Sequence, residues 1–378
     1  MQKPGITAVI LAAGYSDRMG RFKPLLDLEG QPVIERIIAS FKAAGVVDIH
    51  VVTGHHKEML IPLLEKLCVK VIVNDNYAAG MLSSVQAAAK SLDPSIGAFF
   101  LMPADVPLVR TATIRRMAET YNRHRGKILV PVFGGRRGHP PLIASRFAGA
   151  IMSYSGEGGL GGILSLYNQD IFPVPVPDGN ILLDMDTPGD YADLQKRVQR
   201  MDIPTAAECE VILREIYAVP DVVIDHSKAV AEVALFIVDK MNRHGFSIDR
   251  DILLSAALLH DLAKGRPAHA VESARMVREM GYVAVAALIE THMDIVPGTD
   301  AEVSAAEVLY LSDKLVSGDR MVTLPGRFGR AMKRYGDKPE IAGRIKMRYE
   351  NAVSILERIE AKTGAIKFNS GMIAGVTQ

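Results

Sequence analysis

The stretch Thr7-Ala-Val-Ile-Leu-Ala-Ala13 is apolar at every position after the threonine, and Gly14 follows it at once. With Ile6 it forms a run far shorter than the roughly 20 residues that a membrane helix needs. The polar residues Asp17 and Arg18 come soon after it. A short apolar run that ends at a glycine is typical of a strand buried on both faces. The run therefore predicts a central β-strand.

Similar runs recur through the first half of the chain and alternate with amphipathic segments of helical period. Strands are expected at 48–54, 69–74 and 97–105, and helices at 33–44, 56–67, 83–91 and 113–122. Such alternation indicates βαβ units on a mostly parallel sheet. Residues 172–180 read FPVPVPDGN, with prolines at alternate positions, and permit only an edge strand or an extended connection.

Strand signals stop beyond Ile203 and Pro204. From Thr205 onward apolar residues recur at helical spacing, as in Val230, Val233, Ala234, Ile237, Val238 and Met241. We expect an α/β domain over residues 1–203 and an all-α domain over 204–378, with 369–378 frayed. The length of 378 residues fits two domains at roughly 100–200 residues each.

The composition excludes several classes of protein. With 48% hydrophobic and 23% charged residues, the chain has the make-up of an ordinary globular protein. The formal net charge is +1, so no global excess attracts nucleic acid or an anionic membrane, and we expect neither as a partner. Cys68 and Cys209 are the only cysteines and neither has a CxxC partner, which argues against disulfides and a thiolate zinc site and favours a cytoplasmic location.

A loop of small residues follows the first strand, in the string LAAGYSDRMGRFK from Leu11 to Lys23. Small residues let backbone N–H groups approach a phosphate chain, and Arg18 and Lys23 add cationic donors. The string is not a Walker loop. It resembles the LAAGxSxRMGxxK signature of molybdenum cofactor cytidylyltransferases and of the wider MobA-like nucleotidyltransferases. The resemblance implies a Rossmann-like domain in which Arg18 and Lys23 act in catalysis and the nucleotide is bound by Leu11, Ala12, Ala13, Gly14, Arg18 and Lys23.

The resemblance continues along the chain in the expected order. Asn74 and the string Gly80-Met-Leu-Ser83-Ser84 resemble the segment that closes over the nucleotide, and they also fit the N-cap of the following helix. Asp105 ends an apolar strand, where ligands bind in open α/β sheets. In the family this aspartate binds Mg²⁺, an ion that prefers oxygen ligands and shares them with substrate phosphates.

Two further strings resemble family motifs. Gly138-His139-Pro140-Pro resembles the GHP turn near the acceptor, although a histidine in a turn is commonly structural. The string DMDTPGD from Asp184 to Asp190 resembles DxDTPxD and implies Asp186 as a second metal ligand, although an acidic residue before Thr-Pro also suits a helix cap. The glycines of 156–162 depart from the family's GDxG string, since Glu157 replaces the aspartate.

The chemistry implied is attack by a terminal phosphate of the acceptor on the α-phosphorus of a nucleoside triphosphate, with pyrophosphate leaving. This step needs charge neutralisation and in-line positioning, for which Arg18, Lys23 and Asp105 form a minimal set. The resemblance implies CTP as donor, molybdenum cofactor or molybdopterin as acceptor, and a molybdoenzyme or its chaperone as a partner. Relatives that use GTP tend to have LAGG where this chain has LAAG. A sugar or polyol phosphate acceptor stays open.

Histidine and aspartate residues mark a second site in the all-α half. His226 is expected to precede a helix, His260-Asp261 to close one, His269 to open the next, and His292 to end the one after; Asp313 completes the set. Imidazole and carboxylate groups that meet from several helices can hold a divalent transition metal with open positions for water and a phosphate.

This set resembles the H…HD…D pattern of HD metal-dependent phosphohydrolases, matched by His226, His260, Asp261 and Asp313. The strings HDLAKG, HAVESARMV and VLYLSDKL resemble the subgroup that hydrolyses dinucleoside polyphosphates, where two extra histidines, here His269 and His292, support a second metal. The resemblances imply Mg²⁺ in the first half and one or two Mn²⁺, Fe²⁺ or Zn²⁺ ions in the second. Lys264 is either a catalytic contact to the phosphate of a nucleotide or phosphoester substrate, or a solvated lysine. An HD half that only senses a nucleotide is the alternative.

Overall fold

The computed structural model describes residues 5–298, 302–366 and 368, so the stretch 369–378 that was expected to fray lies outside the described residues. The chain forms two compact units, Met1–Met201 and Asp202–Gln378. The sequence analysis placed this division after residue 203. Each unit has its own hydrophobic core. Among the described residues, no helix combines the length and the apolar character needed to cross a membrane.

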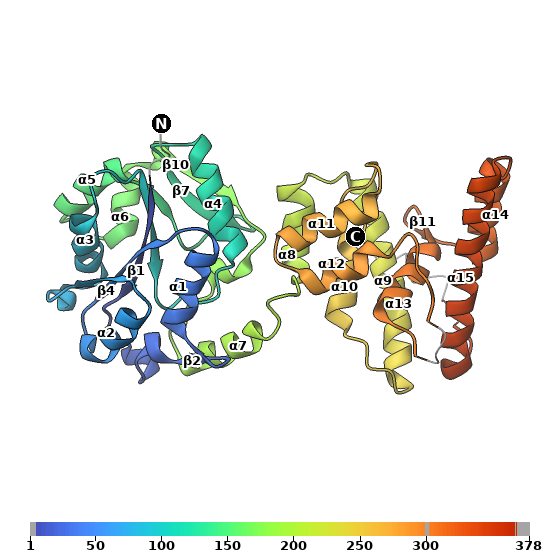
Figure 1. The fold of residues 1–378 in the computed structure, drawn as a ribbon, viewed down its shortest axis with the longest axis horizontal. Coiled ribbons are helices and arrows are strands. Elements are labelled where there is room, and N and C mark those ends of the chain that lie inside the picture. The colour runs from blue at the N-terminus through green and yellow to red at the C-terminus, as the bar shows by residue number, and fades with distance from the viewer. Residues whose placement is uncertain (1–4, 299–301, 367, 369–378) are drawn as a thin grey trace. The chain divides into compact units, whose positions relative to one another are not determined.

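An eight-stranded mixed sheet forms the centre of the first unit (Figure 1). Its strand order is β10 (Ile171–Pro175), β7 (Ile128–Phe133), β9 (Leu142–Ala144), β6 (Ala98–Pro103), β1 (Ile6–Ala12), β4 (Asp48–Thr53) and β5 (Lys70–Val73), with β8 (Arg136–Arg137) paired to β7. The pairs β1–β4, β1–β6, β4–β5 and β7–β10 are parallel, and the pairs of β9 and β8 are antiparallel. The predicted mostly parallel α/β fold is confirmed.

Helices cover both faces of this sheet. They are α1 (Val33–Ala43), α2 (Lys57–Lys66), α3 (Met81–Ser91), α4 (Thr111–Arg123), α5 (Ala148–Ser153), α6 (Gly159–Leu166) and α7 (Pro188–Val198). In Figure 1, α1 and α4 lie on one side, and α3, α5 and α6 on the other. Because both faces are covered, β6 is buried at every position, which explains its continuous apolar run. A short hairpin of β2 (Asp27–Leu28) and β3 (Gln31–Pro32) stands apart from the sheet.

The proline-rich segment lies at the edge of the sheet, as the sequence predicts. Strand β10 pairs with β7 in parallel, with Pro173 and Pro175 opposite Val130 and Val132. Beyond the strand, the Val176 N–H donates to the carbonyl of Val132 at 2.9 Å. The strand thus keeps its hydrogen bonds to β7 although two of its residues lack an N–H.

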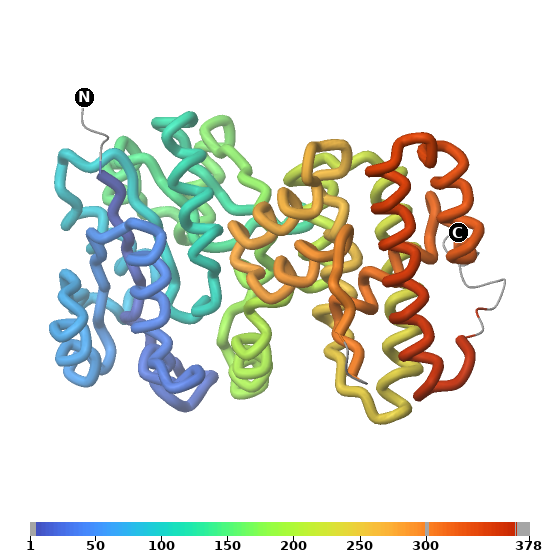
Figure 2. The backbone as a smooth tube through the Cα atoms, turned by 45° about the vertical axis from the view of Figure 1, so that its right-hand side comes forward, coloured from blue at the N-terminus to red at the C-terminus, as the bar shows by residue number. Residues whose placement is uncertain are grey.

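The second unit is helical. Its helices are α8 (Ala206–Val211), a π-helical turn (Ile212–Ile216), α9 (Asp221–Arg243), α10 (Arg250–Leu259), α11 (His269–Glu279), α12 (Val283–Glu290), α13 (Ala305–Lys314), α14 (Leu324–Tyr335) and α15 (Pro339–Thr363). The apolar stripe predicted for α9 is buried. Figure 2 shows α14 and α15, coloured in the red part of the range, side by side.

One short hairpin departs from the all-α prediction. Strands β11 (Val316–Ser317) and β12 (Arg320–Met321) pair antiparallel directly after α13. Gly318, with φ of 62°, provides the left-handed residue that the tight turn needs. Two residues per strand are too few for an alternating pattern, so this hairpin has no strand signal in the sequence.

Candidate active sites

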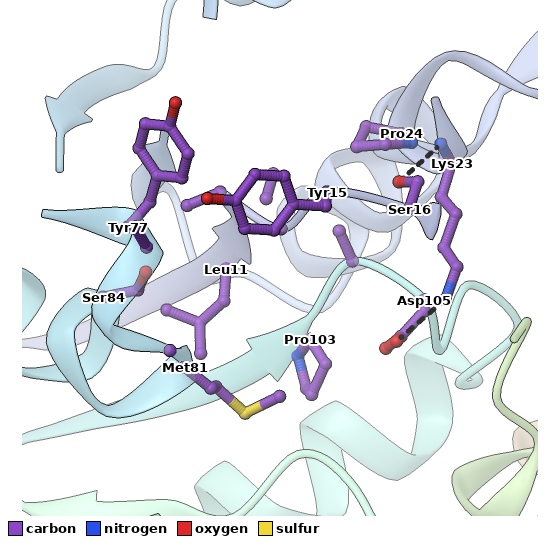
Figure 3. A pocket seen from close by; sticks show the side chains of 16 residues that line it. Leu11, Tyr15, Ser16, Lys23, Pro24, Tyr77, Met81, Ser84, Pro103 and Asp105 are labelled. Atoms are coloured by element: carbon purple, nitrogen blue, oxygen red, sulfur yellow. Dashed lines mark hydrogen bonds and ion pairs between the residues drawn. The ribbon is translucent and has the colours of Figure 1, made fainter. Parts of the chain in front are cut away.

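A cavity of about 320 Å³ opens at the carboxyl ends of β1 and β6 (Figure 3). Four of the predicted nucleotide-binding residues line it, at the end of β1 and directly after it: Leu11, Ala12, Ala13 and Gly14. Other predicted residues that line it are Lys23, Gly80, Ser84 and Asp105. Ligands of open α/β sheets bind at this end of the strands. The cavity therefore has the position expected of a substrate site.

Lys23 bridges two carboxylates at the rim of this cavity. Its Nζ lies 2.8 Å from Asp186 Oδ1 and 3.6 Å from Asp105 Oδ2. Arg18 approaches the other oxygen of Asp186 at 2.8 Å from outside, with 72% of its side chain exposed. The Met185 N–H donates to the Asp105 carbonyl at 2.8 Å, which ties the two carboxylate-bearing segments together. Four predicted residues thus meet in one cluster.

Burial and charge oppose each other at Asp105. Desolvation raises the pKa of this carboxyl above its ordinary value, the Lys23 ammonium works against the rise, and Asp186 and Asp184 add to it. Two carboxylates that share one ammonium supply the hard oxygen donors that Mg²⁺ prefers. Asp105 and Asp186 thus fit a Mg²⁺ ion, whose contribution when bound is charge neutralisation on a triphosphate.

Asp186 does not cap the helix that follows it. The N-cap of α7 is Thr187, whose Oγ1 accepts from the Asp190 N–H in a capping box. Asp190 Oδ2 accepts in turn from the N–H groups of Asp186 and Thr187. The cap leaves the Asp186 side chain to Lys23 and Arg18, so the helix-cap interpretation of Asp186 is wrong.

Asn74 braces the segment before α3. Its Nδ2 donates to the hydroxyls of Ser83 and Ser84, each at 2.9 Å, and its Oδ1 accepts from the Asn76 N–H. The helix starts at Met81 with Gly80 of the predicted string as its N-cap, and no side chain caps it. Of these residues, Gly80 and Ser84 line the cavity. Asn74 and Ser83 do not line the cavity; Asn74 holds the hydroxyl of Ser84, which does.

His139 lies in a turn close to the charged cluster. Its N–H donates to the Ile181 carbonyl at 3.0 Å, and a Cβ on Gly138 would come within 2.5 Å of the same oxygen, so this turn requires glycine. Burial lowers the pKa of His139, against the opposing charges of Asp105 and Asp184. Its buried Nδ1 has no hydrogen-bond partner among the described residues. Pro140 follows across a cis peptide and is buried. The turn thus holds a neutral imidazole beside the Asp105 cluster.

The sequence analysis missed an aromatic wall on this cavity. Tyr15 and Tyr77 line it (Figure 3), with ring centroids 5.4 Å apart. The ring centroid of His55 lies 4.8 Å from that of Tyr15. A Cβ on Gly54 would lie 2.7 Å from the Tyr77 Cβ, so glycine at this position lets the ring pack here. Tyr15 occupies a variable position of the matched signature, and Tyr77 begins a short 3-10 helix, Tyr77–Ala79. Only their aromatic character was available as a signal.

The second unit gathers all six predicted ligands, His226, His260, Asp261, His269, His292 and Asp313. Asp261 lies at the centre, with its Oδ2 at 3.4 Å from His260 Nε2 and 3.6 Å from His226 Nε2. Its Oδ1 lies 3.3 Å from His269 Nε2 and 3.8 Å from His292 Nε2. Asp313 Oδ1 approaches His226 Nε2 at 3.2 Å. Two histidine pairs therefore share one carboxylate, and each trio can hold a metal ion.

His226 lies within α9, and the expectation that it precedes the helix is wrong. The helix begins at Asp221, after the N-cap Pro220. Proline has a fixed φ and is favoured at helix starts, so Pro220 was the overlooked signal. The correction places His226 on a regular helix, where its position is well defined.

Backbone carbonyls fix the orientation of three imidazoles. Nδ1 of His260 contacts the Ala257 carbonyl at 2.8 Å, and Nδ1 of His292 contacts that of Ile289 at 2.7 Å. For His226 the partner is the carbonyl of Gly318, in the β11–β12 turn, at 2.7 Å. Because a carbonyl only accepts, each of these Nδ1 atoms carries the proton. The Nε2 atoms of His260 and His292 therefore present their lone pairs to the cluster, whereas the His226 Nε2 contacts Asp313 Oδ1.

Several polar atoms of this cluster are buried without a hydrogen-bond partner among the described residues. They are the Nε2 atoms of His260, His269 and His292 and the Oδ1 of Asp261. Buried polar groups are normally hydrogen-bonded or bound to a ligand, so this group of unpaired atoms indicates a site for a bound ion. The donor set is rich in imidazole and suits Mn²⁺, Fe²⁺ or Zn²⁺, and the metal would supply an activated water and phosphate binding.

Lysines neutralise both carboxylates of the cluster. Lys264 Nζ lies 2.6 Å from Asp261 Oδ2, and Lys314 Nζ lies 2.6 Å from Asp313 Oδ2. Burial alone would raise the pKa of Asp261, but the neighbouring His260 and His269 side chains and the charge of Lys264 lower it well below its ordinary value. Both carboxylates are therefore ionised and ready to act as ligands. Lys264 faces the cluster, although nearly half of its side chain is exposed.

Comparison with known protein families assigns each unit a class. Residues 8–171 match the MobA-like NTP transferase domain, and residues 223–318 match the HD domain. The chain thus joins a nucleotidyltransferase domain, which takes a nucleoside triphosphate, to an HD domain with a His/Asp cluster that can bind metal.

Individual relatives cover the first unit. The chain is 27% identical over 193 residues to the molybdenum cofactor cytidylyltransferase of Escherichia coli (strain K12), a match that spans 51% of this chain and 96% of that protein. It is 38% identical over 106 residues to the 2-aminoethylphosphonate cytidylyltransferase of Lancefieldella rimae, across 26% of this chain and 42% of that protein.

Solved structures resemble the same unit. The crystal structure of Rv0371c from Mycobacterium tuberculosis H37Rv is 26% identical with a TM-score of 0.46, and covers 51% of this chain and 98% of that one. A nucleotidyl transferase from Methanothermobacter thermautotroptrophicus is 25% identical with a TM-score of 0.47, and covers 52% of this chain and 98% of that one.

Proposed function

We propose that the first unit transfers CMP from CTP to molybdenum cofactor, with Mg²⁺ bound and pyrophosphate released. The observation that carries the proposal is the match to the Escherichia coli molybdenum cofactor cytidylyltransferase, which spans 96% of that protein. The cluster of Lys23, Asp105 and Asp186 beside the cavity supports it, because these groups suit a triphosphate and its metal ion.

The reaction is one displacement at phosphorus. A terminal phosphate oxygen of the acceptor forms a bond to the α-phosphorus of CTP, the bond from that phosphorus to the bridging oxygen breaks, and pyrophosphate leaves with the electron pair. In this proposal Lys23 and Arg18 exchange their carboxylate partners for phosphate oxygens, while Asp105 and Asp186 hold the metal. The loop that follows β1, from Ala13 and Gly14 onward, presents backbone N–H groups to the nucleotide.

The acceptor side is proposed to include His139 and Pro140. The Nδ1 atom of the neutral His139 imidazole, which has no partner among the described residues, offers a hydrogen bond beside Asp105. A second candidate acceptor is a smaller phosphate or phosphonate compound such as a sugar or polyol phosphate. The 38% identity to the 2-aminoethylphosphonate cytidylyltransferase of Lancefieldella rimae favours this alternative, although the match spans 42% of that protein.

For the second unit we propose metal-dependent hydrolysis of a nucleotide or another phosphoester, in which water adds across a phosphorus–oxygen bond. The orphaned Nε2 atoms and the shared carboxylate of Asp261 support one or two divalent transition metals. Lys264 is proposed to leave Asp261 and contact a substrate phosphate at the exposed side of the cluster. A purely regulatory nucleotide-binding role is the alternative.

A pair of assays on the full chain tests both proposals. Pyrophosphate release is followed with CTP or GTP and Mg²⁺, with molybdopterin, sugar phosphates and polyol phosphates as acceptors. Phosphate release from a panel of nucleotides and phosphoesters is followed after Mn²⁺ or Fe²⁺ is added. Fastest transfer to molybdopterin supports the first proposal, and faster transfer to another acceptor replaces it. Steady phosphoester turnover supports the second, and nucleotide binding without turnover supports the regulatory alternative.

A further inference from the structure

Helices α14 and α15 carry a local excess of positive charge that the chain as a whole lacks. From residue 324 to 348 there are eight lysine or arginine side chains and two acidic ones, a net charge of +6 in a chain whose formal net charge is +1. Such a concentration creates a positive field over one part of the surface and attracts an anionic partner. Of these cations, Arg327 lies 3.7 Å from Asp313 of the metal cluster; neither proposed active site uses the others.

Most of these cations form no ion pair with a carboxylate of the described residues. Arg330, Lys333, Arg334, Lys338 and Arg344 are exposed, and none forms an ion pair within 4 Å in the described part of the chain. The remaining cations are engaged: Arg348 pairs with both oxygens of Asp294, Lys346 with Glu350, and Arg327 with backbone carbonyls under the helix. Five free cations on one helical hairpin therefore remain available.

An apolar groove of about 300 Å³ runs between the same two helices. Its walls are Pro325, Phe328, Gly329 and Met332 of α14, at helical i, i+3, i+4 and i+7 spacing, with Ile345 and Tyr349 of α15. Met332 is 38% exposed at its mouth. Methionine, aromatic and arginine side chains together are typical of protein interfaces, and methionine adapts to varied partners.

We propose that this hairpin docks an acidic amphipathic helix of a partner protein. The apolar side of the partner would fill the groove, and its carboxylates would pair with the exposed cations around the groove. An anionic membrane fits less well, because the apolar side of α14 is already buried at Leu324 and Phe328. Nucleic acid would pair with the cations but leave the groove empty. Residues 369–378 contain no acidic side chain to complement the cations.

A defined probe tests the proposal on the full chain. The probe is a fluorescein-labelled peptide of about 16 residues, long enough for four helical turns, with leucine at i, i+3, i+4 and i+7 spacing and glutamate elsewhere. Its binding is measured by fluorescence anisotropy against a peptide of the same composition whose leucines follow no helical spacing. We expect the amphipathic peptide to bind at least 10-fold more tightly, and its affinity to fall at about 0.5 M salt, where charges are screened.

Two variants separate the charge from the groove. The double variant R330E/R334E should weaken peptide binding at least 10-fold, whereas R123E/R125E, an equal charge reversal on exposed arginines of the first unit, should leave it unchanged. Gly329→Trp should also block binding, because a Cβ there meets open space and the ring covers the groove. Gly343→Trp is the matched control, since Gly343 is an exposed helical glycine with open space that does not line the groove.

An anionic membrane and a nucleic acid are tested as alternative ligands of this surface. Vesicles of phosphatidylcholine with anionic phosphatidylglycerol and a single-stranded RNA are measured with the same variants. Equal affinity for both peptides would overturn the proposal, as would peptide binding that Gly329→Trp leaves intact. Tighter binding of vesicles or RNA, lost in R330E/R334E, would assign the surface to that ligand instead.

Discussion

Lys23 and Asp186 lie 163 positions apart in the sequence, yet the lysine Nζ is 2.8 Å from the Asp186 Oδ1. The same ammonium lies 3.6 Å from Asp105, so it is shared between two carboxylates. A shared cation of this kind can be exchanged for a divalent ion, after which the lysine is released to a phosphate. The contact explains why the predicted loop, strand end and late acidic motif form one site.

Asp105→Asn should lower pyrophosphate release about 100-fold while leaving thermal unfolding nearly unchanged. The amide is almost isosteric, and the change removes a charge that the Mg²⁺-bound triphosphate needs. Asp193→Asn is the matched control, because Asp193 is an exposed carboxylate that pairs with Lys196 on α7. Release within a few-fold of the parent at saturating Mg²⁺ would show that Asp105 is not a metal ligand.

Transfer should favour CTP over GTP in a competition assay with both nucleotides present. The motivation is the string from Leu11 to Gly14, which resembles cytidylyltransferases more than guanylyltransferases. The products are separated by chromatography and counted by base. Equal or faster transfer from GTP would contradict the prediction and would move the first unit to the guanylyl branch.

Tyr15→Ala should raise the KM for the nucleotide about 10-fold with a smaller effect on kcat, because a base stacked on an aromatic ring gains roughly 1–3 kcal/mol. Tyr15 and Tyr77 form the aromatic side of the cavity (Figure 3). Tyr15→Phe keeps the ring and should behave like the parent in steady-state kinetics. An unchanged KM in Tyr15→Ala would show that the Tyr15 ring does not bind the nucleotide.

Replacing His260 and Asp261 together by alanine should strip the second unit of metal and hydrolysis while transfer by the first unit survives. The two sites use different ligand chemistry on separate cores. Elemental analysis of the parent should find about one or two transition-metal ions per chain. His244→Ala, a histidine outside the cluster at the end of α9, should retain them.

Two results would count against this prediction. One is a parent that binds no metal and stays inert after Mn²⁺ or Fe²⁺ is added. The other is a double variant that loses cytidylyl transfer although circular dichroism and proteolysis show an intact first unit.

Glu232→Gln should stabilise the protein at pH 7 and have less effect at pH 4. Burial raises the pKa of Glu232, and its buried Oε2 has no hydrogen-bond partner in the described part of the chain. Because the folded-state pKa lies above the unfolded value, the contribution of the protonated carboxyl to stability is present at low pH and is lost as the pH rises through the folded pKa.

The measurement is the melting temperature at both pH values, with an expected gain of about 2 °C at pH 7. Glu357→Gln, an exposed position on α15, is the control and should show no such pH dependence. A gain of equal size at pH 4 would show that ionisation of Glu232 is not the cause.

Hydrophobic periodicity and proline positions predicted those elements whose structure depends on neighbouring residues in the sequence. The strand β6 is buried throughout and shows as an apolar run, and the prolines of β10 limit it to an edge. The histidines and aspartates of the second unit were found because that chemistry needs those residue types. The Tyr15–Tyr77 contact and the double role of Lys23 arise from side chains that meet through space, for which a single sequence has no periodic signal.

Short elements such as the β11–β12 hairpin also could not be predicted from the sequence. The β11–β12 hairpin has two residues per strand, yet its Gly318 carbonyl fixes the His226 ring. Its turn orients a ligand from another helix, so its importance follows from the assembled site and not from its own residues. The start of α9 at Asp221 was predictable from Pro220 and was missed.

The prolines of β10 also protect the sheet against self-association. The Val176 N–H points toward β7, and the direction of the backbone nitrogen alternates along a strand. The nitrogens of residues 173 and 175 therefore face away from β7, and both belong to prolines, which have no hydrogen to donate. A strand from another molecule would meet carbonyls there without the donors needed to extend the ladder. This end of the sheet is therefore a poor template for aggregation, a property that replacing both prolines by valine would remove.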